Sequence, residues 1–256
     1  MQDSRSIEFK DRSHGRYWWF SSTQANYVPP IFSFLTAQEW EIMRDWYEET
    51  EKRFPAGTGE CNVPAMSMLQ GLIMGNNLSR VVQCGHFIGF STLLLGFMMR
   101  RMGHPHSVYS VDIDPNVTAF TKQVVENAGL LAYVHLEVSD SAAPQTAKNA
   151  ATYLQGAPQL LFIDSSHEYN HTKRELDLWF PALQPGGFAI MHDVSAFATS
   201  FDGAGNGGVK QAVQEWARGR DLQVALINDF ASDQHYGDKA PLYRDACGLG
   251  LIQKPI

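Results

Sequence analysis

Two groups of ionisable residues follow apolar, strand-like segments in the second half of the chain. Asp164 and His167 follow one segment, and His192 and Asp193 end the next one. If these segments are neighbouring parallel strands, both aspartates project into the crevice at the carboxyl edge, where open α/β sheets bind ligands. Two carboxylates held close together repel each other, which favours a shared proton or a hard cation such as Mg²⁺. We therefore expect a divalent-metal site formed by Asp164 and Asp193, with His192 as a less suitable third ligand because Mg²⁺ prefers oxygen.

The same residues could also move a proton. A bound cation would polarise a substrate hydroxyl and lower its pKa. Either histidine could instead take that proton as a general base. A purely structural hydrogen-bonding role is the competing interpretation for each histidine. The candidate catalytic residues are Asp164, His167 and His192.

A glycine-containing turn follows an earlier apolar segment, in the stretch Val81-Val82-Gln83-Cys84-Gly85-His86-Phe87-Ile88-Gly89. Gly85 and Gly89 let the backbone pass close to a ligand, and Ser91 begins a helix whose free N–H groups favour an anionic group. A tight turn without a ligand is the alternative. A dinucleotide fingerprint needs a second glycine where this chain has Phe87, so the pattern argues against NAD.

Asp112 ends the next expected strand. A carboxylate there lies beside the glycine turn and can accept hydrogen bonds from both hydroxyls of a ribose. Asp114 directly precedes Pro115, which is typical of a helix N-cap followed by proline at the first helical position. We assign the ribose role to Asp112 and the capping role to Asp114.

This order of strand, glycine turn and acidic strand end resembles the class I S-adenosylmethionine-dependent methyltransferases. The resemblance implies that S-adenosylmethionine is the cofactor. These enzymes commonly carry an acidic residue where this chain has Gln83, whose amide could still bind the methionyl part. By the same resemblance Asp140 would bind the adenine amino group, with Ser141 beside it, although a helix N-cap pair is the alternative. The expected cofactor-binding residues are Gln83, Gly85, Phe87, Gly89, Ser91, Asp112, Asp140, Ser141 and Asp164.

The stretches from Asp164 to Tyr169 and from His192 to Asp193 resemble a narrower group. They are similar to small-molecule O-methyltransferases and cephalosporin-hydroxylase-like proteins with an Asp-x-x-His-x-Tyr motif and a His-Asp pair. The resemblance implies methyl transfer to a hydroxyl of a small metabolite, a sugar or a phenol, in natural-product biosynthesis, assisted by Mg²⁺ or another divalent cation. A metal-independent enzyme with His167 as base, and a non-catalytic cofactor-binding scaffold, are the alternatives.

Strands and helices must alternate to bring these residues together. Apolar segments predict strands near 80–84, 107–111, 132–138, 159–163, 187–191, 222–227 and 248–253. Amphipathic or apolar segments predict helices near 90–102, 116–128, 142–155, 170–180 and 208–218. Strict alternation implies right-handed crossovers. The expected fold is α/β, a doubly wound, mostly parallel, seven-stranded Rossmann-like sheet with an N-terminal helical extension.

The first part of the chain differs from the rest. Thr36 and Glu39 have the spacing of a capping box, which predicts a helix ending before Pro55, and a second helix follows from Pro64. The aromatic run 17–20 should pack this segment on the domain, or it could roof the substrate. We divide the chain into an extension, 1–75, and a cofactor-binding domain, 76–256. The glycine-rich loop 201–208 and the segment 229–243 are expected to border the acceptor site and to become ordered on binding.

Composition limits the partners. The net charge is -7, and no basic run is longer than two residues, which argues against nucleic acid. The 3 cysteines show no metal-binding spacing and fit a reducing compartment. No segment is apolar for long enough to span a bilayer. We expect a cytoplasmic protein with a small-molecule acceptor and no membrane partner, and the sequence is compatible with a homodimer.

Overall fold

The structure is a computed structural model that describes residues 28–54, 57, 59–232 and 242–256. Its centre is a 7-stranded sheet of order β3-β2-β1-β4-β5-β7-β6. The strands are β1 (Val81–Cys84), β2 (Val108–Asp112), β3 (Val134–Val138), β4 (Leu160–Ile163), β5 (Phe188–His192), β6 (Ala225–Ile227) and β7 (Leu249–Gln253). The first five strands are parallel, and β7 runs antiparallel to both β5 and β6. The predicted fold class is confirmed.

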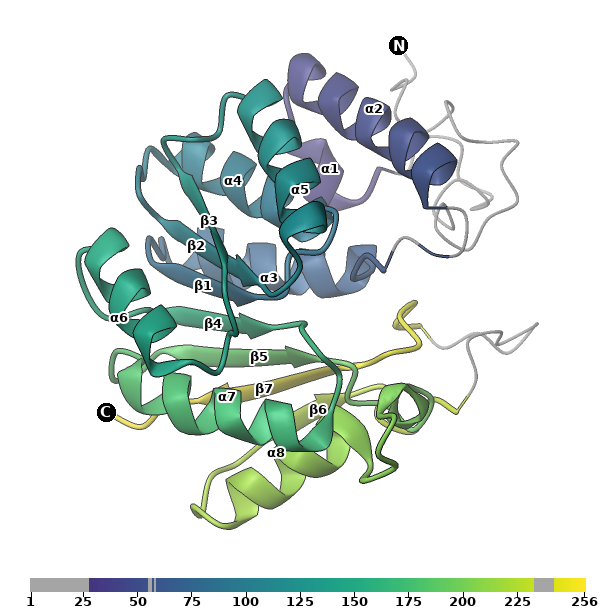
Figure 1. The fold of residues 1–256 in the computed structure, drawn as a ribbon, viewed down its shortest axis with the longest axis vertical. Coiled ribbons are helices and arrows are strands. Elements are labelled where there is room, and N and C mark those ends of the chain that lie inside the picture. The colour runs from purple at the N-terminus through teal and green to yellow at the C-terminus, as the bar shows by residue number, and fades with distance from the viewer. Residues whose placement is uncertain (1–27, 55–56, 58, 233–241) are drawn as a thin grey trace.

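Helices cover both faces of the sheet (Figure 1). Helices α4 (Phe90–Met102) and α5 (Pro115–Asn127) lie on one face, and α6 (Pro144–Tyr153), α7 (Tyr169–Ala182) and α8 (Gly208–Arg218) lie on the other. Two separate clusters of buried apolar side chains fill these two interfaces. The residues of β1 and β4 are buried throughout, which explains why their sequences are apolar runs without alternation.

The register of the sheet places the functional residues at one edge. Cys84, the last residue of β1, pairs with Val111 in β2 and with Ile163 in β4. Ile163 in turn pairs with Met191 in β5. Because these strands are parallel, the residues that follow the paired positions are level with one another. The glycine turn, Asp112, Asp164 and His192 therefore meet at the carboxyl edge.

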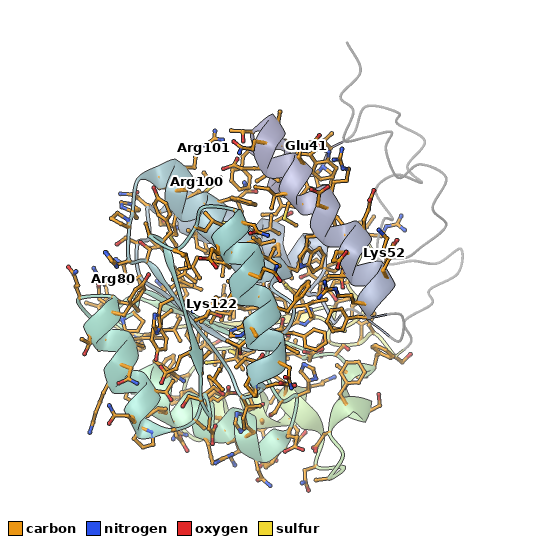
Figure 2. All side chains as sticks on the ribbon, turned by 45° about the horizontal axis from the view of Figure 1, so that its top comes forward. Glu41, Lys52, Arg80, Arg100, Arg101 and Lys122 are labelled. Atoms are coloured by element: carbon orange, nitrogen blue, oxygen red, sulfur yellow. The ribbon has the colours of Figure 1, made fainter. Side chains whose placement is uncertain are left out.

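The N-terminal segment forms α1 (Pro30–Ser33), α2 (Ala37–Arg53) and α3 (Val63–Gly75). The predicted capping box is confirmed, because Thr36 N–H donates to Glu39 Oε2 at 2.7 Å and Glu39 N–H donates to Thr36 Oγ1 at 3.2 Å. Glu39 Oε1 also lies 2.7 Å from Arg100 in the last turn of α4, and Figure 2 shows Arg100 and Arg101 near α2.

This extension shares one buried cluster with the sheet and α4. Trp46 in α2 donates from Nε1 to the carbonyl oxygen of Ile88 at 2.7 Å, which joins the extension to the glycine turn. The aromatic run 17–20 lies outside the described residues. Among the helices of the described ranges, none has both the length and the hydrophobicity that a bilayer crossing requires.

Candidate active site

A cavity of about 390 Å³ opens at the carboxyl edge of the sheet. It is bounded by the turns after β1, β2, β3 and β4, together with the segment that leads into α3. All the residues predicted to bind the cofactor line it except Gln83: they are Gly85, Phe87, Gly89, Ser91, Asp112, Asp140, Ser141 and Asp164. The sequence therefore predicted which turns form the cavity wall.

The glycine turn is held in a conformation that few residues could adopt. Gly85 has φ 86°, and a Cβ atom there would lie 2.0 Å from the carbonyl oxygen of Asp164. Asp112 Oδ2 accepts hydrogen bonds from the backbone N–H groups of His86 at 3.1 Å and Phe87 at 2.9 Å. Asp112 thus faces the cavity and also fixes the turn beside it.

The structure confirms one of two predicted helix N-caps and not the other. Asp114 is the N-cap of α5, and its Oδ1 accepts from the N–H of Asn116 at 2.7 Å, as expected. The N-cap of α6 is Ala143, without a side-chain cap bond, so Asp140 and Ser141 do not cap that helix. Asp140 Oδ1 instead accepts from the N–H of Ala142 at 2.8 Å within the turn.

Gln83 lies beneath the cavity and has 0% of its surface exposed. Its Nε2 donates to Ser91 Oγ at 2.6 Å, and its Oε1 accepts from Thr92 Oγ1 at 3.0 Å and Ser110 Oγ at 3.2 Å. The expected contact of Gln83 with the cofactor is therefore corrected. Its amide joins β1 to β2 and α4 because its side chain points into the protein interior.

His86 is a site residue that the sequence reasoning did not single out. It is buried at the bottom of the glycine turn, with Nδ1 3.0 Å from Ser110 Oγ and Nε2 2.9 Å from Thr118 Oγ1. Burial lowers the pKa of His86 to about 4, although the nearby charge of Asp112 acts in the opposite direction. His86 is therefore neutral near pH 7 and links the turn to β2 and α5.

This shift predicts that His86 makes folding less favourable in acid. Its pKa is about 6.5 in the unfolded chain and about 4 in the folded one, so the unfolded state binds more protons between these values. The contribution of the neutral His86 side chain to the free energy of unfolding is complete above pH 6.5 and is lost as the pH falls towards 4. From pH 7 to pH 5 we expect wild type to lose about 1 to 2 kcal/mol more unfolding free energy than His86→Asn. Urea titrations at both pH values measure this, and parallel losses in the two proteins would contradict it.

Three ionisable side chains converge next to the cavity. His167 Nε2 lies 3.4 Å from Asp193 Oδ2 and 3.9 Å from Asp164 Oδ1, and the ligand atoms of the three residues lie within 4.8 Å of one another. His167 and Asp193 have positive φ angles of 61° and 64°. Non-glycine residues in this region are strained, and such strain is concentrated at functional sites. This group, here called the acidic triad, fits a divalent cation.

His192 lies behind the acidic triad and does not line the cavity. It is buried, with Nδ1 3.2 Å from Asp193 Oδ2 and 3.3 Å from Asp164 Oδ1, while Nε2 lies 2.9 Å from Asp245 Oδ2. Burial alone would lower its pKa, but the charges of Asp193, Asp245 and Asp164 outweigh burial and raise it well above the usual value. Both ring nitrogens therefore face carboxylates. His192 also forms a second group that could hold a metal ion, with Asp245 and Cys247, so its roles as metal ligand and catalytic residue stay predictions.

The neighbouring charges also change the pKa of Asp193. Burial alone would raise the pKa of Asp193, but the charge and hydrogen bond of His192, together with His167, lower it to about 2. Asp193 is therefore ionised at neutral pH. An ionised carboxylate is the form that binds a cation.

Asp245 is a second site residue that the sequence reasoning missed. It precedes β7 and is 2% exposed. Its Oδ1 accepts from the N–H of Cys247 at 3.0 Å, which turns Oδ2 towards His192. The antiparallel pairing of β7 with β5 brings this segment beside His192. The sequence pattern of the strands did not reveal this pairing, so Asp245 was not predicted.

The glycine-rich loop borders the triad. The ring of Phe201, at the end of a short 3₁₀ helix (Ala198–Phe201), lies 5.7 Å from the ring of His167. Asp202 organises the loop, because its carboxylate accepts from the N–H groups of Ala204, Asn206 and Gly208 at 2.9 to 3.1 Å. The loop therefore lies beside the acidic triad, and its predicted place at the border of the acceptor site and its ordering on binding stay predictions. Residues 233–241 of the second expected segment lie outside the described residues.

The strand order, the antiparallel β7 and the cavity at the carboxyl ends of β1, β2 and β4 agree with the Rossmann-like fold that the sequence resemblance implied. Residues 82–194 match the family model described as a methyltransferase domain. This stretch runs from β1 to the residue after Asp193. This part of the chain is therefore similar to methyltransferase domains, as the sequence motifs indicated. None of the curated proteins matches the chain significantly.

Solved structures share the fold at low sequence identity. An O-methyltransferase from Bacillus cereus in complex with SAH is 14% identical, with a TM-score of 0.63 over 89% of this chain and 96% of that one. TomG from Streptomyces achromogenes, an O-methyltransferase of tomaymycin synthesis in complex with SAM, is 14% identical with a TM-score of 0.63 over 88% and 93%. The SAH-bound methyltransferase PaMTH1 from Podospora anserina is 17% identical, with a TM-score of 0.60 over 84% and 88%.

Proposed function

We propose that this enzyme transfers a methyl group from S-adenosylmethionine to a hydroxyl oxygen of a small molecule. One observation carries the proposal: Asp164 and His167 belong both to the cavity wall and to the acidic triad. A methyl donor in the cavity and an acceptor at the triad would therefore meet at these two residues. The similar structures that are described as O-methyltransferases support transfer to oxygen.

The chain offers suitable partners for each part of the cofactor. The carboxylate of Asp112 would accept from the ribose hydroxyls, and that of Asp140 from the adenine amino group. Gly85 lines the cavity, and its lack of a side chain lets the turn after β1 pack against the backbone of Asp164 and Ser165 beside it. When bound, S-adenosylmethionine supplies a methyl group on a positively charged sulfur, which leaves as a neutral thioether. The protein then has mainly to align the donor with the acceptor oxygen, and alignment can contribute several kcal/mol.

The acidic triad would perform the second task, which is to prepare the acceptor oxygen. Two carboxylates and one imidazole form a donor set that suits a divalent cation, Mg²⁺ or one that tolerates nitrogen better. Asp164, His167 and Asp193 would hold the ion, whose chemistry when bound is to lower the pKa of a hydroxyl. In the alternative, His167 itself takes the proton as a general base. It is the suitable histidine, since it lines the cavity and His192 does not.

A methyl-transfer screen tests the proposal. Purified protein is incubated with S-adenosylmethionine and a panel of phenols, sugars and amines, with and without EDTA. We expect methylated product from at least one hydroxyl compound, together with an equal amount of S-adenosylhomocysteine, and loss of both in EDTA. Product formed from amines alone would overturn transfer to oxygen. Hydroxyl methylation at full rate in EDTA would favour His167 as base over the metal.

We also propose a cellular compartment and a kind of acceptor for this protein. Cys61, Cys84 and Cys247 are free thiols, and burial raises the pKa of Cys61 and Cys84 above the usual value. Unreactive buried thiols support a reducing compartment such as the cytoplasm. The net charge of -7 supports a small-molecule acceptor over nucleic acid.

A further inference from the structure

A buried carboxylate lies behind the wall of the cavity and takes no part in the proposed chemistry. Glu175, in α7, is 0% exposed. It accepts hydrogen bonds from Ser141 Oγ at 2.5 Å and from Ser165 Oγ at 2.8 Å, and His171 Nε2 lies 3.4 Å away. These three partners line the cavity, whereas Glu175 does not.

A contact with Arg174 orients the His171 ring, one of the groups around this carboxylate. Arg174 Nη2 lies 2.8 Å from His171 Nδ1 and, as a pure donor, requires that nitrogen to accept. Nε2, which faces Ser141 and Glu175, then carries a hydrogen, and the hydrogen bond with Glu175 raises the pKa of His171. A buried charge is tolerated when such donors satisfy it, so Glu175 joins the turn after β3 to the turn after β4.

Trp179 holds the same turn from one helical turn further along α7. Its Nε1 donates to the carbonyl oxygen of Ser141 at 2.8 Å, and its side chain is 1% exposed. Glu175 and Trp179 are four residues apart, so they lie on one face of the helix. Together they fix Ser141 through both its side chain and its main chain.

We propose that Glu175 and Trp179 are positioning residues that set the selectivity of the cavity for an adenine base. The proposal rests on the proposed function, in which the carboxylate of Asp140 accepts from the adenine amino group. The Asp140 carboxylate accepts from the N–H of Ala142 and lies 3.8 Å from His171 and Arg174. Because Asp140 directly precedes Ser141, the contacts behind Ser141 hold the main chain from which that carboxylate projects. A base with a carbonyl oxygen in place of the amino group would face the carboxylate with like partial charge. A rigid turn should reject such a base, and a loosened turn should reject it less.

Calorimetry with two ligands measures this selectivity directly. Dissociation constants are determined for S-adenosylhomocysteine and for S-inosylhomocysteine, in which a carbonyl replaces the amino group. The proteins are wild type, Glu175→Gln, Trp179→Phe and the control Asp177→Asn. Asp177 lies on the same helix, is 54% exposed and pairs with Arg220 away from the cavity. Thermal unfolding confirms that each protein is folded.

We expect wild type and Asp177→Asn to prefer the adenine ligand by at least about tenfold. Glu175→Gln and Trp179→Phe should lower that preference at least threefold. An unchanged preference in both folded variants would overturn the proposal, even if both affinities fall together, because that result indicates general loosening. If Glu175→Gln does not fold, Trp179→Phe decides alone. Failure of wild type to bind S-adenosylhomocysteine would overturn the proposed function itself.

Discussion

Asp193→Asn is expected to lower kcat by about a thousandfold or more while changing the affinity for S-adenosylhomocysteine by less than about threefold. Such a loss corresponds to about 4 kcal/mol of transition-state free energy, within the range of acid–base and metal-ion catalysis. Asp193 belongs to the acidic triad but does not line the cavity. Its substitution should therefore affect the methyl-transfer step and leave cofactor binding unchanged. Asp164 belongs both to the triad and to the cavity wall, so Asp164→Asn should impair turnover and binding together.

Glu168→Gln is the matched control, since Glu168 is an exposed neighbour of His167 outside the triad. It should keep kcat within about twofold. EDTA should reproduce the effect of Asp193→Asn in wild type, and added Mg²⁺ should restore wild type only. Normal turnover by Asp193→Asn would remove Asp193 from the site. Loss of turnover in this variant without sensitivity to EDTA would assign proton removal to His167.

Gly85→Ala is expected to destabilise the fold by at least about 3 kcal/mol. The new Cβ would lie 2.0 Å from the carbonyl oxygen of Asp164 and 2.8 Å from Cα of Ser165, and the backbone has φ 86°. Neither neighbour is a flexible side chain, so β1 and β4 would have to separate at the edge of the cavity. The left-handed conformation costs alanine roughly 1 kcal/mol more. For a chain of this size the melting temperature should fall by roughly 6 to 12 °C.

Gly71→Ala provides the comparison, because Gly71 lies inside α3 with nothing within 4 Å of its would-be Cβ. It should be neutral or stabilise by up to about 1 kcal/mol, since alanine is the better helix former. Differential scanning calorimetry measures both variants. Equal melting temperatures for Gly85→Ala and wild type would show that β1 and β4 do not approach as closely as this structure has them.

The sequence predicted the edge of the sheet well because the decisive features are local. Gly85 and Asp164 each follow a short strand, Asp112 ends one, and parallel register then brings the three residues to one edge. The capping roles of Thr36 and Asp114 are equally local, since each depends on residues within one helical turn.

The sequence reasoning missed contacts between residues far apart in the sequence. Gln83 was expected to bind the cofactor, but its side chain meets Ser110 on the next strand inside the protein. The contact of His192 with Asp245, 53 residues further on, was not foreseen. Neither pairing produces a periodic pattern or a fixed spacing. Only the three-dimensional arrangement of β2, β5 and β7 reveals them.

The most direct test of the central claim is a crystal structure of the protein grown with S-adenosylhomocysteine and Mg²⁺. We predict adenosylhomocysteine in the cavity, with its ribose at Asp112 and its adenine at Asp140, and the cation bound by Asp164, His167 and Asp193. His192 should remain between the three carboxylates that surround it here. A cofactor bound elsewhere, or a cation bound by His192 in place of His167, would contradict the account.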